Sequence, residues 1–323
     1  MTLSQPQTAR ATPFAYRPLD EGPYRLAMGL LSLKPDAWIE IDRHYDRYLA
    51  EKRRLLQERP DEVFAALPEA AAASAELRDL LVAHLTRVFP ERFRQDGGSL
   101  TRLPDGARFE LEGALHPLDL AGRLVQEDLC LMQPGREGYR LTAASLCFPT
   151  RWRLHDKLGR PMAQIHEPVP FYGEKLARPV DLFFERMKSD KPVWRLNWSL
   201  TDDPELFQPS GHGRMECDPG ITSATAGERI FFRVERQTLR RLPDSGAICF
   251  GIRVYQNPLS DLEGDPAGAA RLAAALRQLP DAVLRYKSIK VFDRPLLSYL
   301  DRIAGTDAAP QGSKTGEKVD PKS

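Results

Sequence analysis

The stretch Ile230–Tyr255, IFFRVERQTLRRLPDSGAICFGIRVY, indicates the fold more strongly than any other part of the chain. Two runs rich in β-branched and aromatic residues, Ile230–Arg240 and Ala247–Tyr255, flank LPDSG, a sequence that favours a tight turn. Polar and apolar residues alternate along both runs, as they do in a strand that buries one face. The pattern predicts an antiparallel hairpin.

The first arm of this hairpin predicts a polar row on one strand face. Arg233, Glu235 and Gln237 are two residues apart and therefore point to the same side. The run Val193–Leu200 (VWRLNWSL) also alternates, with tryptophan and leucine on one face and three polar residues on the other: Arg195, Asn197 and Ser199. On an exposed sheet such a row is routine. Inside a pocket, Glu235 could hold a cationic amine, and Arg233 could polarise bound oxygen or orient Glu235.

Further strands and helices are predicted around this hairpin. Glu127–Met132 and Gly138–Phe148 flank the turn sequence PGREG and predict a second hairpin, and Ala107–Glu112 predicts a short strand. Hairpins rather than helical crossovers join the strands, which favours an antiparallel sheet and the α+β class. Helices are predicted over Asp36–Gln57, Asp61–Leu67, Ala70–Val88, Pro117–Val125, Glu174–Met187, Asp265–Leu279, Pro280–Tyr286 and Arg294–Ile303.

The order of these segments suggests four parts. We expect an irregular, proline-rich arm over residues 1–35 and a helical cap region over 36–92. The sheet and the C-terminal helices would form the core over 93–303. The last residues, 304–323, are polar with little to bury, so we expect a disordered tail.

Composition and motifs exclude several classes of function. Lys plus Arg is 46 and Asp plus Glu is 45, so no global positive field attracts nucleic acid. No apolar run approaches the roughly 20 residues of a membrane helix, and the N-terminus lacks a signal pattern, so we expect a cytoplasmic protein. The cysteines are scattered and no dinucleotide-binding fingerprint occurs. Electrons for any redox chemistry would therefore come from another protein.

The most suggestive chemistry lies in Ser145–Tyr172, SLCFPTRWRLHDKLGRPMAQIHEPVPFY. This stretch concentrates cations around one tryptophan and ends on a histidine; the residues concerned are Arg151, Trp152, Arg153, Lys157, Arg160 and His166. A flat dianionic cofactor such as haem would suit them, because it needs an imidazole for iron, cations for its carboxylates and aromatic rings for its faces. A solvated basic loop is the alternative interpretation.

His166 is the candidate metal ligand. Pro168 and Pro170 stiffen the backbone next to it, and an axial ligand needs a fixed backbone. A histidine making an ordinary hydrogen bond at a loop–helix junction is the alternative. His155, in the same cationic stretch, is the second candidate for the ligand.

Four blocks of sequence resemble the haem-dependent oxidative N-demethylase α-subunit family, whose founding member oxidises dimethylamine. They are QEDLCLM (126–132), AASLCFPTRWRLHDKLGRPMAQIHEPVPFY (143–172), VWRLNWSL (193–200) and FRVERQTLRRLPDSGAICFGIRVY (232–255). The resemblance covers about residues 20–300. It implies a haem-binding PAS-like domain with helical additions. It also implies partner subunits that carry flavin, an iron–sulfur centre and tetrahydrofolate, with NADPH as the source of electrons.

The resemblance predicts roles for the residues above. His166, in the family-like sequence HEPVP, would bind the iron of haem b. Arg151, Arg153 and Lys157 would hold the haem propionates, with Trp152 against the ring. Glu235 would balance an ammonium charge, and Arg233 would assist it. The predicted function is oxidative N-demethylation of a small methylated amine with O2. The alternatives are a PAS-like haem or gas sensor without turnover, and a small-molecule-binding protein without haem.

Overall fold

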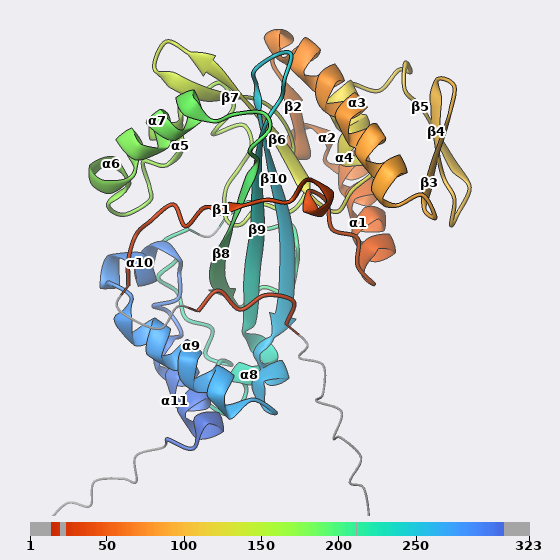
Figure 1. The fold of residues 1–323 in the computed structure, drawn as a ribbon. Coiled ribbons are helices and arrows are strands. Elements are labelled where there is room, and N and C mark those ends of the chain that lie inside the picture. The colour runs from red at the N-terminus through yellow and green to blue at the C-terminus, as the bar shows by residue number, and fades with distance from the viewer. Residues whose placement is uncertain (1–13, 20–23, 211, 307–323) are drawn as a thin grey trace, which may run out of the picture.

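A seven-stranded antiparallel sheet forms the centre of the molecule in the computed structural model, which describes residues 14–19, 24–210 and 212–306 (Figure 1). Neighbouring strands follow the order β1-β8-β9-β10-β6-β7-β2. In that order their bounds are Leu31–Ser32, Val193–Thr201, Phe231–Arg241, Ile248–Pro258, Asp128–Gly135, Gly138–Ser145 and Phe64–Ala66. The predicted antiparallel sheet is confirmed. Its assignment as PAS-like rests on the resemblance and stays a prediction.

The predicted hairpins are confirmed in the same sheet. β9 and β10 pair along their whole length, from Arg241 opposite Ile248 to Phe231 opposite Pro258. The turn between them needs a glycine, because Gly246 has a φ of +68°, in the left-handed region. β6 and β7 pair across PGREG and carry a bulge between Leu131 and Met132.

The register of β8 and β9 places the predicted polar residues on one face of the sheet. Asn197 lies opposite Glu235, and Arg195 lies opposite Gln237. Residues opposite each other in a ladder share a face, so both strands contribute to a single polar row. We call this side the polar-row face. The tryptophans and leucines of β8 lie on the other side, as predicted.

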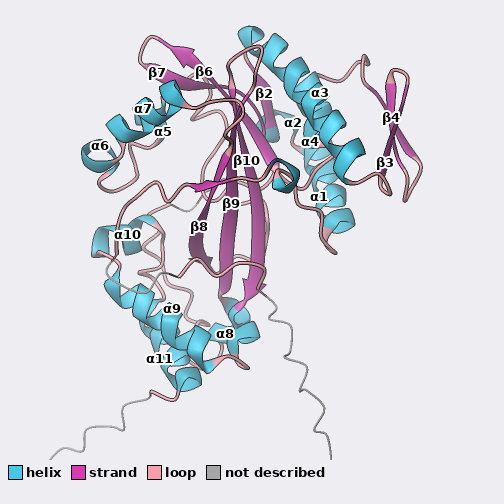
Figure 2. Ribbon diagram, viewed as in Figure 1, coloured by secondary structure: helices cyan, strands magenta, loops and turns pink. Residues whose placement is uncertain are grey.

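The helices cover the sheet in three groups (Figures 1 and 2). α1, α3 and α4 lie near β2 and β6, α5 to α7 lie near β7, and α8 to α11 gather toward the opposite end of the long strands. The bounds are α1 Tyr45–Glu58, α2 Pro60–Val63, α3 Ala71–Val88, α4 Pro117–Gly122, α5 Met162–Ile165, α6 Tyr172–Lys175, α7 Ala177–Arg186, α8 Ala226–Arg229, α9 Pro266–Gln278, α10 Asp281–Tyr286 and α11 Asp293–Ala304. No helix of the described segments is long and apolar enough to cross a membrane.

A second, small sheet lies beyond α3. It contains β3 (Phe93–Asp96), β4 (Ser99–Arg102) and β5 (Ala107–Glu110) in antiparallel order. The strand predicted from Ala107 is therefore present, in this sheet rather than in the central one.

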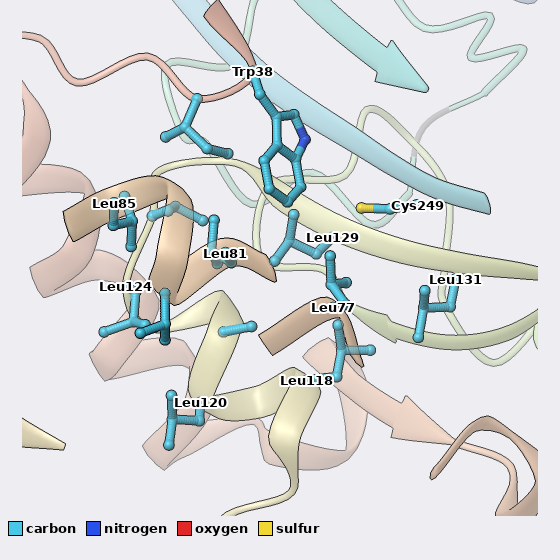
Figure 3. Packing of buried hydrophobic residues seen from close by; sticks show 14 of the residues in the cluster. Trp38, Leu77, Leu81, Leu85, Leu118, Leu120, Leu124, Leu129, Leu131 and Cys249 are labelled. Atoms are coloured by element: carbon cyan, nitrogen blue, oxygen red, sulfur yellow. The ribbon is translucent and has the colours of Figure 1, made fainter. Parts of the chain in front are cut away.

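The core beside the helical region is built from leucines at helical spacing. Leu77, Leu81 and Leu85 recur every four residues along α3 and are fully buried (Figure 3). They pack toward the sheet, where Leu129 of β6 and Cys249 of β10 belong to the same cluster. Burial of each leucine contributes about 2 kcal/mol, so this helix is held by packing rather than by capping.

Two helix predictions are wrong, one because of strand pairing and the other because of a local side-chain hydrogen bond. Of the predicted helix Asp61–Leu67, only residues 61–63 are helical, within α2 (Pro60–Val63); Phe64–Ala66 forms β2 and pairs with β7. The predicted helix from Asp36 begins only at Tyr45. The carboxylate of Asp42 accepts the N–H of His44 at 2.8 Å, which replaces the hydrogen bond of an earlier helical turn.

The helix predicted over Glu174–Met187 is also wrong, because it is two helices. α6 ends at Lys175 and α7 begins at Ala177. Pro179 explains the break: proline has no N–H to donate and is tolerated only in the first turn of a helix, where it lies here.

The predicted division into an arm, a cap, a core and a tail stays a prediction. The structure describes part of the arm, and β1 within it pairs with β8. The cap region contributes β2 to the central sheet. Most of the predicted disordered tail, residues 307–323, lies outside the described residues.

Candidate functional site

Glu235 is the buried carboxylate of the polar-row face, with 8% of its surface exposed. Its Oε1 accepts a hydrogen bond from the hydroxyl of Thr150 at 2.5 Å. Its Oε2 accepts from the amides of Gln237 at 2.8 Å and Asn197 at 3.3 Å. Each carboxylate oxygen can accept two hydrogen bonds, so Oε1 keeps room for one further donor. The carboxylate is held in place and keeps an unused acceptor position at Oε1.

Arg233 does not bind Glu235 directly. Its Nε donates to the Thr150 hydroxyl at 3.0 Å, and that hydroxyl in turn donates to Glu235. Its other nitrogens donate to Gln256 and to backbone carbonyls, including those of Phe148 at 2.9 Å and Leu206 at 3.0 Å. The guanidinium thus joins two loops beneath the site and orients Glu235 through Thr150.

Two further cations lie near Glu235. Lys287, which follows α10, donates to the carbonyl of Trp198 and to Oδ1 of Asn197, the latter at 3.3 Å. Burial lowers the pKa of Lys287 to about 8, although Glu235 opposes this and favours the charged form. Arg195 lies on the same face, and burial lowers its pKa as well. Lys287 and Arg195 therefore make the polar-row face more positive than Arg233, Glu235 and Gln237 of β9 would make it alone.

His166 lies directly after the single turn of α5. Its ring stacks on Tyr172 with centroids 4.6 Å apart and planes inclined by 12°. Its Nδ1 lies 3.0 Å from the carbonyl oxygen of Met162. A carbonyl can only accept, so Nδ1 carries the proton and the lone pair is on Nε2. Desolvation lowers the pKa of His166 to about 4, so the ring is neutral at neutral pH.

This geometry fits an axial haem ligand. Metal-binding histidines usually donate the second ring N–H to a carbonyl or carboxylate, which fixes the tautomer and the plane of the ring. Met162 and Tyr172 supply the hydrogen bond and the plane here. No group of three or more His, Cys, Asp or Glu side chains suited to a metal ion occurs among the described residues. A haem needs only one such imidazole, because the porphyrin supplies the other ligands.

The cations of the predicted cofactor loop do not form one cluster. Arg151 is buried, has a φ of +61°, and donates to the carbonyls of Lys287 and Leu200. Lys157 donates to the carbonyl of Ile165, next to His166. Arg153 is exposed. Their predicted contacts with propionates stay predictions.

The other aromatic candidates of this region differ in environment. Trp152 is partly buried against the apolar cluster that contains Tyr172 and Leu154. His155 is exposed and lies against the carbonyl of Asp61, away from the polar row. His155 therefore lacks the enclosure that His166 has.

An open groove of about 500 Å³ lies on the other face of the sheet. Tyr16, Glu40, Asp42 and Tyr255 contribute its polar groups. Tyr16 and Tyr255 both donate to Glu40, while Arg253 pairs with Asp42 at 2.8 Å. The polar groups satisfy one another, and no histidine lines the groove.

The sequence interpretation named Arg195 only as a member of a strand face, and it missed Lys287 and Thr150 as parts of the site. The alternation of β8 was a sufficient signal for the position of Arg195. No local pattern could connect Lys287 with β8, because about 90 residues separate it from Asn197.

The fold and site define a class of protein: an antiparallel α+β chain with a charged sheet face and imidazoles fixed by a backbone carbonyl and a stacked tyrosine, at His166 and also at His212. A comparison with protein families agrees with it. The family model described as haem-dependent oxidative N-demethylase, alpha subunit-like, matches residues 29–297. The match covers most of the chain, and the chain belongs to this family. The family description implies haem-dependent oxidoreductase chemistry and an enzyme with further subunits.

Proposed function

We propose that this chain is the haem-binding subunit of a monooxygenase that removes a methyl group from a small methylated amine, with His166 as the iron ligand. The geometry of His166 is the observation that carries the proposal. Its Nδ1–H is bound to Met162, its ring is stacked on Tyr172, and its Nε2 has the free lone pair. The family match supports the same cofactor and reaction.

The overall reaction consumes two electrons from a reductant for each methyl group removed. A methylated amine, O2, two electrons and two protons give the demethylated amine, formaldehyde and water. One oxygen atom enters the methyl C–H bond, and the resulting N-hydroxymethyl amine breaks its C–N bond to release formaldehyde. Haem, when bound, would supply the activation of O2.

The polar row would bind and orient the amine. Glu235 would accept an N–H of the substrate ammonium at Oε1 and balance its charge, because an unpaired cation is costly in a partly dry site. Arg233 would hold Glu235 in position through Thr150. Arg151, Arg153 and Lys157 would contribute positive charge for the propionates, and Trp152 an apolar contact for the ring.

The electrons would come from a separate reductase. The sequence contains no dinucleotide fingerprint and no cysteine cluster, which supports delivery by a partner with flavin and an iron–sulfur centre that oxidises NADPH. Dimethylamine is one candidate substrate within the proposed class.

The test is the absorption spectrum of the purified full chain after addition of haem. We expect a Soret band that shifts or weakens in His166→Ala and returns when free imidazole is added. His155→Ala is the matched control and should give the wild-type spectrum. An unchanged band in His166→Ala would exclude this ligand. The absence of a Soret band in the wild type would exclude the haem enzyme. If the protein binds haem but releases no formaldehyde from any methylated amine when a reductant is present, the sensor function would remain.

A further inference from the structure

Arg195 is an exception among the arginines of the central sheet. The others bind acceptors or stack on aromatic rings: Arg140, Arg233, Arg236, Arg240, Arg241 and Arg253. For Arg195 the described parts of the chain provide no hydrogen bond, ion pair or aromatic ring. Its Nε is buried without a partner.

Glu235 is the carboxylate that acts electrostatically on Arg195, but it does not form an ion pair with it. Glu235 raises the pKa of Arg195, yet burial outweighs this and lowers it. Glu235 makes its hydrogen bonds to Thr150, Asn197 and Gln237 instead. Lys287 adds a second positive charge, and Arg195 in turn lowers the pKa of Lys287. The local balance of these three groups is one negative charge against two positive.

A partly dehydrated guanidinium without an acceptor is unfavourable. Its planar, forked N–H groups match the paired oxygens of a carboxylate or a phosphate. Of these two groups, the proposed reaction supplies a carboxylate. The side chain of Arg195 is also partly exposed, so a ligand on the polar-row face can reach its guanidinium.

We propose that Arg195 binds the carboxylate of a molecule held on the polar-row face. This proposal rests on the proposed function and deepens it, because two sources supply such a group in that reaction. One is a haem propionate, which would make Arg195 a cofactor-binding residue. The other is the carboxylate of the substrate, which would then be an N-methylated amino acid rather than a simple amine.

The test compares wild type with Arg195→Gln, which removes the charge, and Arg195→Lys, which keeps the charge but loses the fork. Arg140→Gln is the matched control, because Arg140 is also on the sheet but pairs with Glu69 at the surface. The probes are haem, haem dimethyl ester, N,N-dimethylglycine and dimethylamine. Haem binding is measured by absorbance titration, and amine binding by calorimetry and by the shift of the Soret band.

If Arg195 holds a propionate, Arg195→Gln binds haem about tenfold to a hundredfold more weakly, while the dimethyl ester binds both proteins equally. If it holds the substrate, haem binding is unchanged and N,N-dimethylglycine binds about tenfold or more weakly, whereas dimethylamine is unaffected. Arg195→Lys should fall between in either case. Equal binding of every probe by wild type and Arg195→Gln would overturn the proposal.

The proposed function can fail separately. If the wild type binds no haem, calorimetry of N,N-dimethylglycine with the haem-free protein still tests Arg195. If Arg195→Gln no longer binds N,N-dimethylglycine and Arg140→Gln still does, Arg195 forms a carboxylate site even though the protein is not a haem enzyme. If the haem-free wild type does not bind N,N-dimethylglycine either, both the proposed function and the carboxylate site at Arg195 are overturned. Thermal melts of each variant establish that it is folded.

Discussion

The Nδ1 of His166 lies 3.0 Å from the backbone carbonyl oxygen of Met162, at the start of the one-turn helix α5. This contact fixes the tautomer of the imidazole, because the carbonyl cannot donate. The stacked ring of Tyr172 fixes its plane. Two contacts from the same short segment thus orient Nε2 before any ligand binds.

The stacking partner gives the first prediction. Tyr172→Phe keeps the ring, so we expect haem binding and the Soret maximum to match the wild type. Tyr172→Ala removes the ring that fixes the plane of the imidazole and leaves only the hydrogen bond to Met162, so haem affinity should fall about tenfold. Absorbance titration measures both variants. Equal affinities for Tyr172→Ala and Tyr172→Phe would contradict the role of the stack.

Glu235 gives the second prediction. Glu235→Gln keeps the size of the side chain but removes its charge, so binding of a methylated ammonium should weaken about tenfold to a hundredfold while haem affinity is retained. Calorimetry with dimethylamine measures the change. Glu69→Gln is the control, since it removes a carboxylate from a surface pair with Arg140. A loss of equal size in both variants would show that the effect is one of overall charge.

The central sheet could be predicted because its strands carry their own signal. The alternation in β8 and β9 fixed the faces, and the turn before Gly246 fixed the hairpin. β2 could not be predicted, because three residues, Phe64–Ala66, form a strand only through pairing with β7. α7 starts later than predicted because Pro179 has no N–H to donate and is accommodated in the first turn of the helix.

The site could be predicted in part for the same reason. The polar row follows from the two-residue spacing on β9 and β8. The grouping of Arg151, Arg153 and Lys157 by sequence distance was less informative, because their contacts differ. Arg151 donates to the carbonyls of Lys287 and Leu200, whereas Lys157 donates to the carbonyl of Ile165. Lys287 reaches Asn197 only after the C-terminal helices have packed, and short-range patterns carry no such information.

Arg233 gives a prediction about stability. The side chain is 1% exposed and donates to carbonyl oxygens of two loops, so Arg233→Met should lower the free energy of unfolding by about 3 kcal/mol. Urea unfolding measures it. Arg153→Met is the matched control: this side chain is exposed, and its loss should change stability by less than about 0.5 kcal/mol. Similar losses in the two variants would contradict the proposed joining of the loops.

His84 gives a prediction about pH. The imidazole is 4% exposed between Trp38 and Phe89, and burial lowers its pKa from 6.5 to about 4. Between these pH values the unfolded chain binds a proton that the folded chain does not, so stability falls as the pH decreases. The contribution of this one group between pH 7 and pH 4.5 is about 2 kcal/mol.

The variant His84→Leu isolates this contribution, because a leucine cannot bind a proton. His166 also has a pKa lowered to about 4, but it is present in both proteins and cancels in the difference. Arg87 and Arg240 further lower the pKa of His84, and Asp36 raises it. These three residues are the same in both proteins, so the comparison reports on His84. Urea unfolding at pH 7 and pH 4.5 should show a smaller loss of stability in His84→Leu, by about 2 kcal/mol. Parallel losses in the two proteins would mean that His84 takes up its proton in the folded state as readily as in the unfolded one.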